Sequence, residues 1–334
     1  MQSNRLYTFI MLAAIGAASV VSAQSDNWTE ARKAIHRDRN LCGSNYTAYP
    51  TPTEKLTPAP KGYEPFYLTN YARHGSRWLC GDWQYQDVMK PLQAAREKGK
   101  LTAEGEQLLS AVEEFYKGAQ GRIGELTTKG EDQHHGIGRR MARNFPQVFN
   151  AKNSRVDARS TVVIRCILSM EAECEELTRH FPNLVMHNDV STTYQWYLAP
   201  TTPDYVQKAE EGRNGLEQKW RKELVHPERF GKLLFNDEAY ARDEVNCERL
   251  MRRVFEVCGN MQSHYGAPAL WQYFTEDDAS DLWKLYNMRF YAEFGASNYT
   301  RKKAPFKVET LLRNVIETAD TIVNQKDYHG ATNR

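Results

Sequence analysis

Strand-like and helix-like segments alternate between residues 66 and 190 of this 334-residue chain, and this alternation limits the folds open to it. The strand-like runs are short and apolar, and the helix-like segments repeat apolar residues at i, i+4 spacing. The expected strands are 66–72, 156–159 and 184–187, and the expected helices are 83–97, 102–118, 127–145, one from the N-caps Ser160 and Thr161 to His180, and nearly all of 203–323. This order predicts an α/β fold in which helices flank a parallel-sheet core and a helical subdomain is inserted.

Composition along the chain suggests its division into units. Prolines are dense between Pro50 and Pro65, which disfavours regular helix and indicates an extended arm. The expected units are a signal peptide at 1–23, a Pro-rich extended arm at 24–65, the α/β core at 66–190, a mainly helical subdomain at 191–300, and a helix that returns to the core within 301–334. No strand is expected after that last helix, so the final strand of the core should be missing.

The N-terminal residues predict export. One positive side chain, Arg5, precedes an uncharged and mostly apolar stretch that ends in Val21-Ser22-Ala23, an acceptable cleavage pattern before Gln24. An uncleaved anchor is the alternative, although the stretch is shorter than the ~20 apolar residues that a spanning helix needs. We therefore expect a periplasmic or secreted protein with no stable membrane insertion after cleavage.

Charge and cysteine content narrow the possible partners and cofactors. The chain has 44 Lys and Arg against 42 Asp and Glu, with no basic block that would indicate a nucleic-acid partner. No CxxC pair occurs, so neither a zinc site nor another metal or cofactor is expected. In an exported protein the cysteines are free to pair, and the sequence leaves both the pairing and the oligomeric state open; they are Cys42, Cys80, Cys166, Cys174, Cys247 and Cys258.

The strongest chemical signal is the run Arg73-His74-Gly75-Ser76-Arg77, directly after the first expected strand. Ligands of open α/β sheets bind beyond the carboxyl ends of strands. Gly75 permits a tight turn there, and guanidinium groups match phosphate oxygens in geometry and charge. A histidine held between two arginines is suited to attack phosphorus and carry the phosphoryl group. A solvated basic turn is the alternative interpretation.

A third arginine, Arg159, ends the second expected strand beside Ser160 and Thr161. A parallel sheet brings the carboxyl ends of its strands to one edge, so we expect Arg159 to face the same crevice as the run 73–77. The alternative is a surface arginine next to an ordinary helix N-cap.

Three motifs follow one another with an order and spacing that resemble a known family from about residue 60 to 190. They are the run 73–77, which resembles RHGxR; Leu126-Thr127-Thr128-Lys129-Gly130 with His134 and Arg139-Arg140-Met141, which resembles LTxxG…H; and Arg159-Ser160-Thr161 with Arg165-Cys166 and Ser169-Met170, which resembles a second arginine motif. The family is the histidine acid phosphatases, branch 2 of the histidine phosphatase superfamily. Within it the chain most resembles the multiple inositol polyphosphate phosphatases, which include phytases.

The resemblance implies a phosphoglycerate mutase-like fold and hydrolysis of phosphate esters, in particular inositol polyphosphates such as phytate. The histidine of the family's first motif is the nucleophile, so His74 would form a phosphohistidine. Arg73, Arg77 and Arg159 would bind the phosphate and stabilise the transition state. His134 would lie next to the site and contact the substrate. No metal would be needed.

The family's third motif is missing from this sequence. That motif is a His-Asp or His-Ala-Glu near the C-terminus, whose acid protonates the leaving oxygen. The histidines after residue 190 are His226, His264 and His329, and none precedes an acid. Tyr291-Ala292-Glu293 is only superficially similar, because it lies too early and inside a helical pattern. We therefore expect a C-terminally truncated chain.

Two hypotheses remain open. The first is an exported phosphomonoesterase that acts on small phosphate esters through a phosphohistidine on His74. The second is a catalytically impaired fragment, or a pseudoenzyme that binds phosphate esters, which keeps His74 and the arginines but lacks the proton donor.

Overall fold

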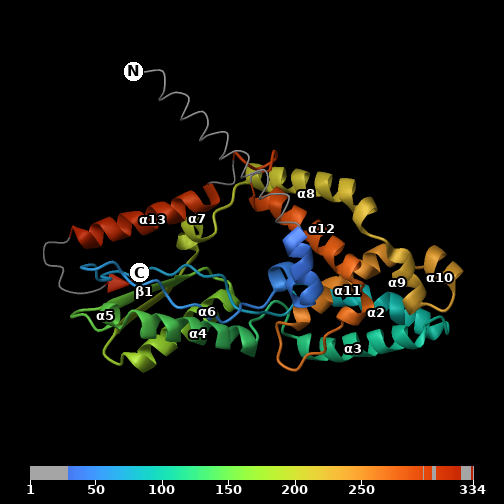
Figure 1. The fold of residues 1–334 in the computed structure, drawn as a ribbon, viewed down its shortest axis with the longest axis horizontal. Coiled ribbons are helices and arrows are strands. Elements are labelled where there is room, and N and C mark those ends of the chain that lie inside the picture. The colour runs from blue at the N-terminus through green and yellow to red at the C-terminus, as the bar shows by residue number, and fades with distance from the viewer. Residues whose placement is uncertain (1–28, 296, 303–305, 325–331, 334) are drawn as a thin grey trace, which may run out of the picture.

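The computed structural model describes residues 29–295, 297–302, 306–324 and 332–333. The predicted signal peptide at 1–23 and its cleavage site therefore lie outside the described residues. Figure 1 shows an elongated molecule with two parts, which we call the α/β lobe and the helical lobe. Within the described ranges, no helix is both long and apolar enough to cross a membrane.

The α/β lobe contains the sheet and the helices that surround it (Figure 1). Its elements are β1 (Arg155–Ser160), β2 (Val185–Val190), β3 (Thr332–Asn333), α4 (Thr128–Asn144), α5 (Pro146–Phe149), α6 (Ile164–His180), η2 (Thr192–Tyr194), α7 (Gln195–Leu198) and α13 (Phe306–Val323). The helical lobe contains η1 (Arg39–Tyr46), α2 (Asp82–Glu97), α3 (Ala103–Ala119), α8 (Pro203–Leu224), α9 (Pro227–Leu234), α10 (Glu238–Asp243), α11 (Cys247–Met261), η3 (Trp271–Tyr273) and α12 (Glu276–Phe294).

The sheet is parallel, with the strand order β2-β1-β3. Arg155 of β1 lies opposite Val185 of β2 and, on the other edge, opposite Thr332 of β3. Helix α6 forms the crossover that a parallel β1-β2 pair requires. The predicted α/β fold with a parallel sheet and a helical insertion is confirmed. The expectation that no strand follows the last helix is corrected, because β3 adds a two-residue strand to β1.

The first expected strand, 66–72, is an irregular segment in the structure. A strand requires a neighbour for its backbone groups, and this segment pairs with none of the described strands β1, β2 and β3. The run is also less buried than its apolar composition predicted, since Phe66 is 46% and Tyr71 61% exposed. The apolar pattern therefore identified a segment that crosses the lobe, but not its conformation.

Two helix boundaries also differ from expectation. Ser160 still belongs to β1, opposite Val190, and its hydroxyl donates to the carbonyl of Thr161, so α6 begins only at Ile164. The predicted arm at 24–65 is helical at 29–37 and over η1, because its prolines begin only at Pro50. Residues 47–65 contain neither helix nor strand, as the proline density predicted.

Two hydrophobic cores divide the chain differently from the predicted limits at 190 and 191. The larger core combines α2 and α3 with α9, α11 and α12, so the helical lobe uses residues from before and after the sheet. Its largest fully buried side chains include Tyr85, Leu109, Phe230 and Leu250. The smaller core lies in the α/β lobe and consists of Ala142, Phe149, Val156, Leu177 and Leu184.

Candidate active site

The turn that carries His74 lies between the first turn of α4 and the helix α6. The amide of Gly75 donates to Ser169 Oγ at 3.0 Å, and the amide of Ser76 donates to Gln133 Oε1 at 2.9 Å. A Cβ added to Gly75 would lie 2.2 Å from the carbonyl oxygen of Gly130. The backbone of the turn therefore lies against the backbone of α4, which only glycine permits.

The imidazole of His74 is held in one neutral tautomer. Its Nδ1 lies 2.8 Å from the carbonyl oxygen of Gly75. A carbonyl oxygen can only accept, so Nδ1 carries the proton and Nε2 keeps its lone pair. Burial lowers the pKa of His74 to about 4; Arg165, Arg73 and Arg77 act in the same direction, and the bond to the Gly75 carbonyl opposes them.

Three arginines lower the pKa of this imidazole, and none of them has a carboxylate partner among the described residues. In the described part of the chain, no carboxylate lies within ion-pair distance of Arg73, Arg77 or Arg165. Each guanidinium instead donates to a backbone carbonyl: Arg73 to Asn45 at 2.9 Å, Arg77 to Trp78 at 2.9 Å, and Arg165 to Gly124 at 3.1 Å. Their uncompensated positive charge favours an anionic ligand beside His74.

Arg165 is the functional candidate that the sequence analysis did not assign. It is the second residue of α6, and its Nε atom is buried without a hydrogen-bond partner among the described residues. A helix N-terminus offers unpaired amide groups and a favourable dipole to an anion. The signal that could have found it was the position of Arg165 at the start of a helix, within the second arginine motif.

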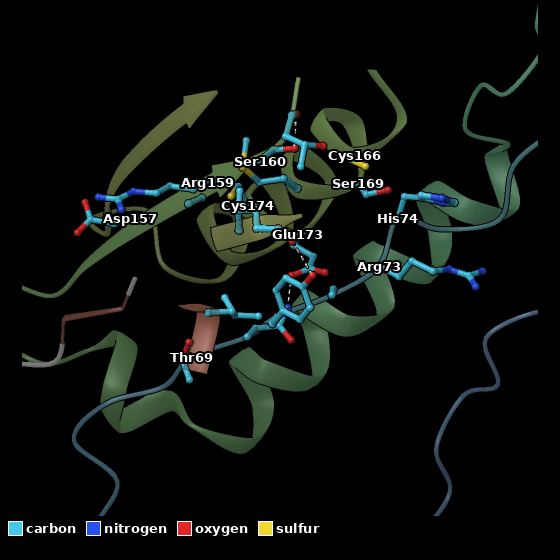
Figure 2. A pocket seen from close by; sticks show the side chains of 18 of the residues that line it. Thr69, Arg73, His74, Asp157, Arg159, Ser160, Cys166, Ser169, Glu173 and Cys174 are labelled. Atoms are coloured by element: carbon cyan, nitrogen blue, oxygen red, sulfur yellow. Dashed lines mark hydrogen bonds between the residues drawn. The ribbon is translucent and has the colours of Figure 1, made fainter. Parts of the chain in front are cut away.

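Arg159, by contrast, is not brought to His74. Figure 2 shows its side chain running in the opposite direction from those of Arg73 and His74, toward Asp157. Its Nη1 donates to Tyr197 Oη at 3.3 Å, and its guanidinium lies 4.9 Å from the ring centre of Tyr194. Side chains alternate between the faces of a strand, and this alternation exposes Arg159 while it buries Ser160. Arg159 still lines the same cavity as Arg73 and His74, as the sequence predicted, but its side chain points away from the imidazole.

A cavity of about 430 Å³ lies behind the turn, between the segment 67–74, β1, α6 and α13. Arg73, His74, His134 and Arg159 all line it, whereas Arg77 and Arg165 do not. His134 is only 3% exposed, and its Nδ1 lies 2.6 Å from Glu173 Oε1. The structure thus places His134 in the wall of the cavity, bonded to a carboxylate.

No proton donor with a free carboxyl group is evident in this cavity. Its two acidic lining residues are Asp157 and Glu173. Asp157 lies 3.3 Å from His187 and from Arg155, and Glu173 bonds to both His134 and Asn70. Glu293 of the run 291–293 lies in α12 of the helical lobe, so that run has no place at this site.

The arm before the site makes two contacts with the arginines of the site that the sequence analysis missed. The ring centre of Tyr46 lies 5.3 Å from the guanidinium carbon of Arg77, and Asn45 supplies the carbonyl that accepts from Arg73. Both contacts join residues about thirty positions apart, which no local pattern reveals. Within the described ranges, no group of three or more His, Cys, Asp and Glu side chains is placed to hold a metal ion.

Comparison with known proteins identifies the fold. No protein-family model matches the chain, and no curated protein matches it by sequence. The solved structures that it resembles include the multiple inositol polyphosphate phosphatase of Bifidobacterium longum in complex with inositol hexasulfate, with a TM-score of 0.65 and 17% identity over 86% of this chain and 76% of that one. The complex of that phosphatase with phosphate gives a TM-score of 0.64 and 17% identity over 86% and 75% of the two chains. The chain therefore shares the α/β fold of these phosphatase structures.

Proposed function

We propose that the protein is a phosphomonoesterase in which His74 attacks the phosphorus atom of a phosphate ester. The proposal is carried by one observation: a neutral imidazole, with its Nε2 lone pair, lies among three arginines that no recorded carboxylate neutralises. A bond forms between Nε2 and phosphorus while the ester P–O bond breaks, and the leaving alkoxide takes a proton from water. Water then attacks the phosphohistidine, which releases inorganic phosphate and restores Nε2.

In this proposal Arg73, Arg77 and Arg165 bind the phosphoryl oxygens and stabilise the charge of the transition state. Arg159, which the sequence assigned to the same phosphate, has an outer position in the cavity wall. We propose inositol polyphosphates as the substrates, on the motif resemblance and on the fold shared with a phosphatase that was solved with inositol hexasulfate. The concentrated positive charge suits a ligand with several phosphate groups.

The test combines phosphate release with trapping of the intermediate. The purified chain is assayed with inositol hexakisphosphate and with p-nitrophenyl phosphate, and a radioactive phosphate ester is quenched in alkali, because phosphohistidine is acid-labile. Label on His74, and loss of both turnover and label in a folded His74→Ala variant, would support the proposal. Label on a serine or an aspartate would refute it.

A phosphate-ester-binding protein with impaired turnover is the second candidate, and the engaged state of Asp157 and Glu173 favours it. General acid catalysis is worth about 10²- to 10⁴-fold and matters most for poor leaving groups. A chain without a proton donor should therefore hydrolyse p-nitrophenyl phosphate but hardly inositol hexakisphosphate. Efficient turnover of both substrates would exclude this candidate.

We also propose that the protein is exported to the periplasm or secreted, because residues 1–23 have the charge and apolar pattern of a cleaved leader. The protein recovered outside the cytoplasm should have the intact mass of a chain that begins at Gln24. A mass that retains residues 1–23 would contradict cleavage.

A further inference from the structure

The segment that carries His74 is held by side chains rather than by a sheet. Among the described residues, no hydrogen bond between backbone groups is recorded for 64–75. Besides the bond from Arg73 to the Asn45 carbonyl, three bonds tie it to the α/β lobe: Asn70 Nδ2 donates to Glu173 Oε2 at 2.8 Å, Tyr71 Oη donates to the carbonyl of Leu198 at 2.9 Å, and the Gly75 amide donates to Ser169 Oγ at 3.0 Å. The position of the nucleophile therefore depends on these few side chains.

Two of the three bonds end on one face of α6. Ser169 and Glu173 are four residues apart, so they lie one above the other on the helix. Ser169 holds the segment at Gly75, next to the nucleophile, and Glu173 holds it five residues earlier at Asn70. Figure 2 shows Glu173 projecting from α6 toward the segment that carries Thr69 and Arg73.

The carboxylate of Glu173 is itself fixed from behind. Its Oε1 lies 2.6 Å from Nδ1 of His134, which is 3% exposed, while its Oε2 accepts from Asn70. The two helices that carry this pair are in close contact, because a Cβ added to Gly138 of α4 would lie 2.9 Å from the carbonyl oxygen of Glu173. Both oxygens are thus engaged, and one partly buried carboxylate joins α4, α6 and the segment.

We propose that Glu173 is a positioning residue for His74: backed by His134, it holds Asn70 and so fixes the segment from which the imidazole projects. The expected loss of turnover rests on the proposed function. The role of Glu173 in holding the segment does not. A nucleophile displaced by ~1 Å loses up to about 10²-fold in rate. Of the three arginines proposed to bind phosphate, only Arg73 lies on this segment, so substrate binding should change less than turnover.

The test uses Glu173→Gln, a near-isosteric change that leaves one side-chain oxygen. When that oxygen accepts from Nδ1 of His134, the new amide group faces that of Asn70. The double variant Asn70→Asp with Glu173→Gln reverses donor and acceptor and restores the bond. The matched control is Glu171→Gln. Glu171 lies on the same helix as Glu173, and its carboxylate also accepts from an asparagine amide, that of Asn188 at 2.9 Å. The readouts are kcat and KM with p-nitrophenyl phosphate, and amide hydrogen exchange of peptides from 70–76 and from α11.

Glu173→Gln is expected to lower kcat by ~10- to 100-fold with little change in KM. Amide exchange should speed up at 70–76 but not in α11, and the double variant should recover both properties. The inference is overturned if exchange at 70–76 stays at the wild-type rate, if it rises equally in both lobes, or if the double variant recovers nothing.

The same experiment separates this inference from the proposed function. A wild-type chain without turnover would refute the proposed function, whereas faster exchange confined to 70–76 in Glu173→Gln would still support the positioning role. An active wild type whose Glu173→Gln and Glu171→Gln variants have equal kcat would overturn the positioning role alone.

Discussion

At the scale of single residues, the charge on His74 links the chemistry of the site to the stability of the protein. Burial and three arginines lower the pKa of this imidazole to about 4. His264 is lowered to about 4 as well, by burial and then by Arg122 and Lys129. Both imidazoles therefore remain neutral in the folded protein at pH values where those of the unfolded chain become protonated.

We expect the free energy of unfolding to decrease as the pH falls from about 6.5 toward 4, because only the unfolded chain gains protons at these histidines in that window. A His74→Asn variant lacks one such site, so its stability should decrease less over the same window. Urea unfolding at several pH values measures this. A variant whose pH dependence coincides with that of the wild type would contradict the lowered pKa of His74.

The two arginines of the second motif should differ in their contribution to turnover. Arg165→Ala removes a cation that acts on His74 and should lower kcat/KM by about 10²-fold or more. Arg159→Ala removes a guanidinium that contacts Tyr194 and Tyr197, and the loss should be clearly smaller. Kinetics on folded variants decide the order. Equal losses would show that Arg159 reaches the phosphate during the reaction.

At the scale of elements, the contact between the turn at His74 and the start of α4 leaves no room for an added side-chain atom. A Cβ on Gly130 would lie 2.2 Å from the carbonyl oxygen of Ser76, just as a Cβ on Gly75 would meet Gly130. Both are contacts with backbone atoms, so a neighbouring side chain cannot relieve them. The Thr127 N-cap, whose Oγ1 accepts from the Gly130 amide, places the first turn of α4 at this contact.

Gly130→Ala is expected to destabilise the protein by about 1–3 kcal/mol, because the added methyl group overpacks two backbones. Gly136→Ala is the matched control in the same helix, since its Cβ would meet only the flexible end of Arg140 at 3.4 Å. That control should stabilise by up to about 1 kcal/mol through helix propensity. Denaturant midpoints compare the two. The prediction would be wrong if the variants shifted the midpoint equally.

At the scale of the whole molecule, the two lobes differ in how much of each element is buried. Helix α11 is enclosed by α2, α9 and η1, and its residues from Val254 to Met261 are all buried. In β2 no residue is fully buried, and α13 exposes Leu312, Ile316 and Val323. The larger core therefore belongs to the lobe that does not carry the imidazole.

Amide hydrogen exchange should reflect this asymmetry. Peptides from α11 and α2 should exchange slowest, close to the rate of global unfolding, while peptides from β2 and α13 should exchange through local opening. Mass spectrometry of exchange over minutes to days measures the difference. Uniform protection across both lobes would show instead that the molecule opens as one cooperative unit.

Local signals in the sequence were enough to predict most helices and to locate the turn at His74. Apolar periodicity predicted α2, α3 and α4 to within a residue or two, because each depends on residues close together in the chain. The run 73–77 could be recognised for the same reason, since its histidine, glycine and arginines are consecutive. These features were determined by the sequence alone.

Tertiary structure decided what depends on distant partners. The segment 66–72 has strand composition, but it pairs with none of the described strands and its backbone is irregular. The side chain of Arg159 points away from His74, whereas Arg165, at the start of α6, lowers the pKa of that imidazole. The bond from Asn70 to Glu173 joins residues 103 positions apart. Such contacts follow from how the elements pack, which no stretch of neighbouring residues specifies.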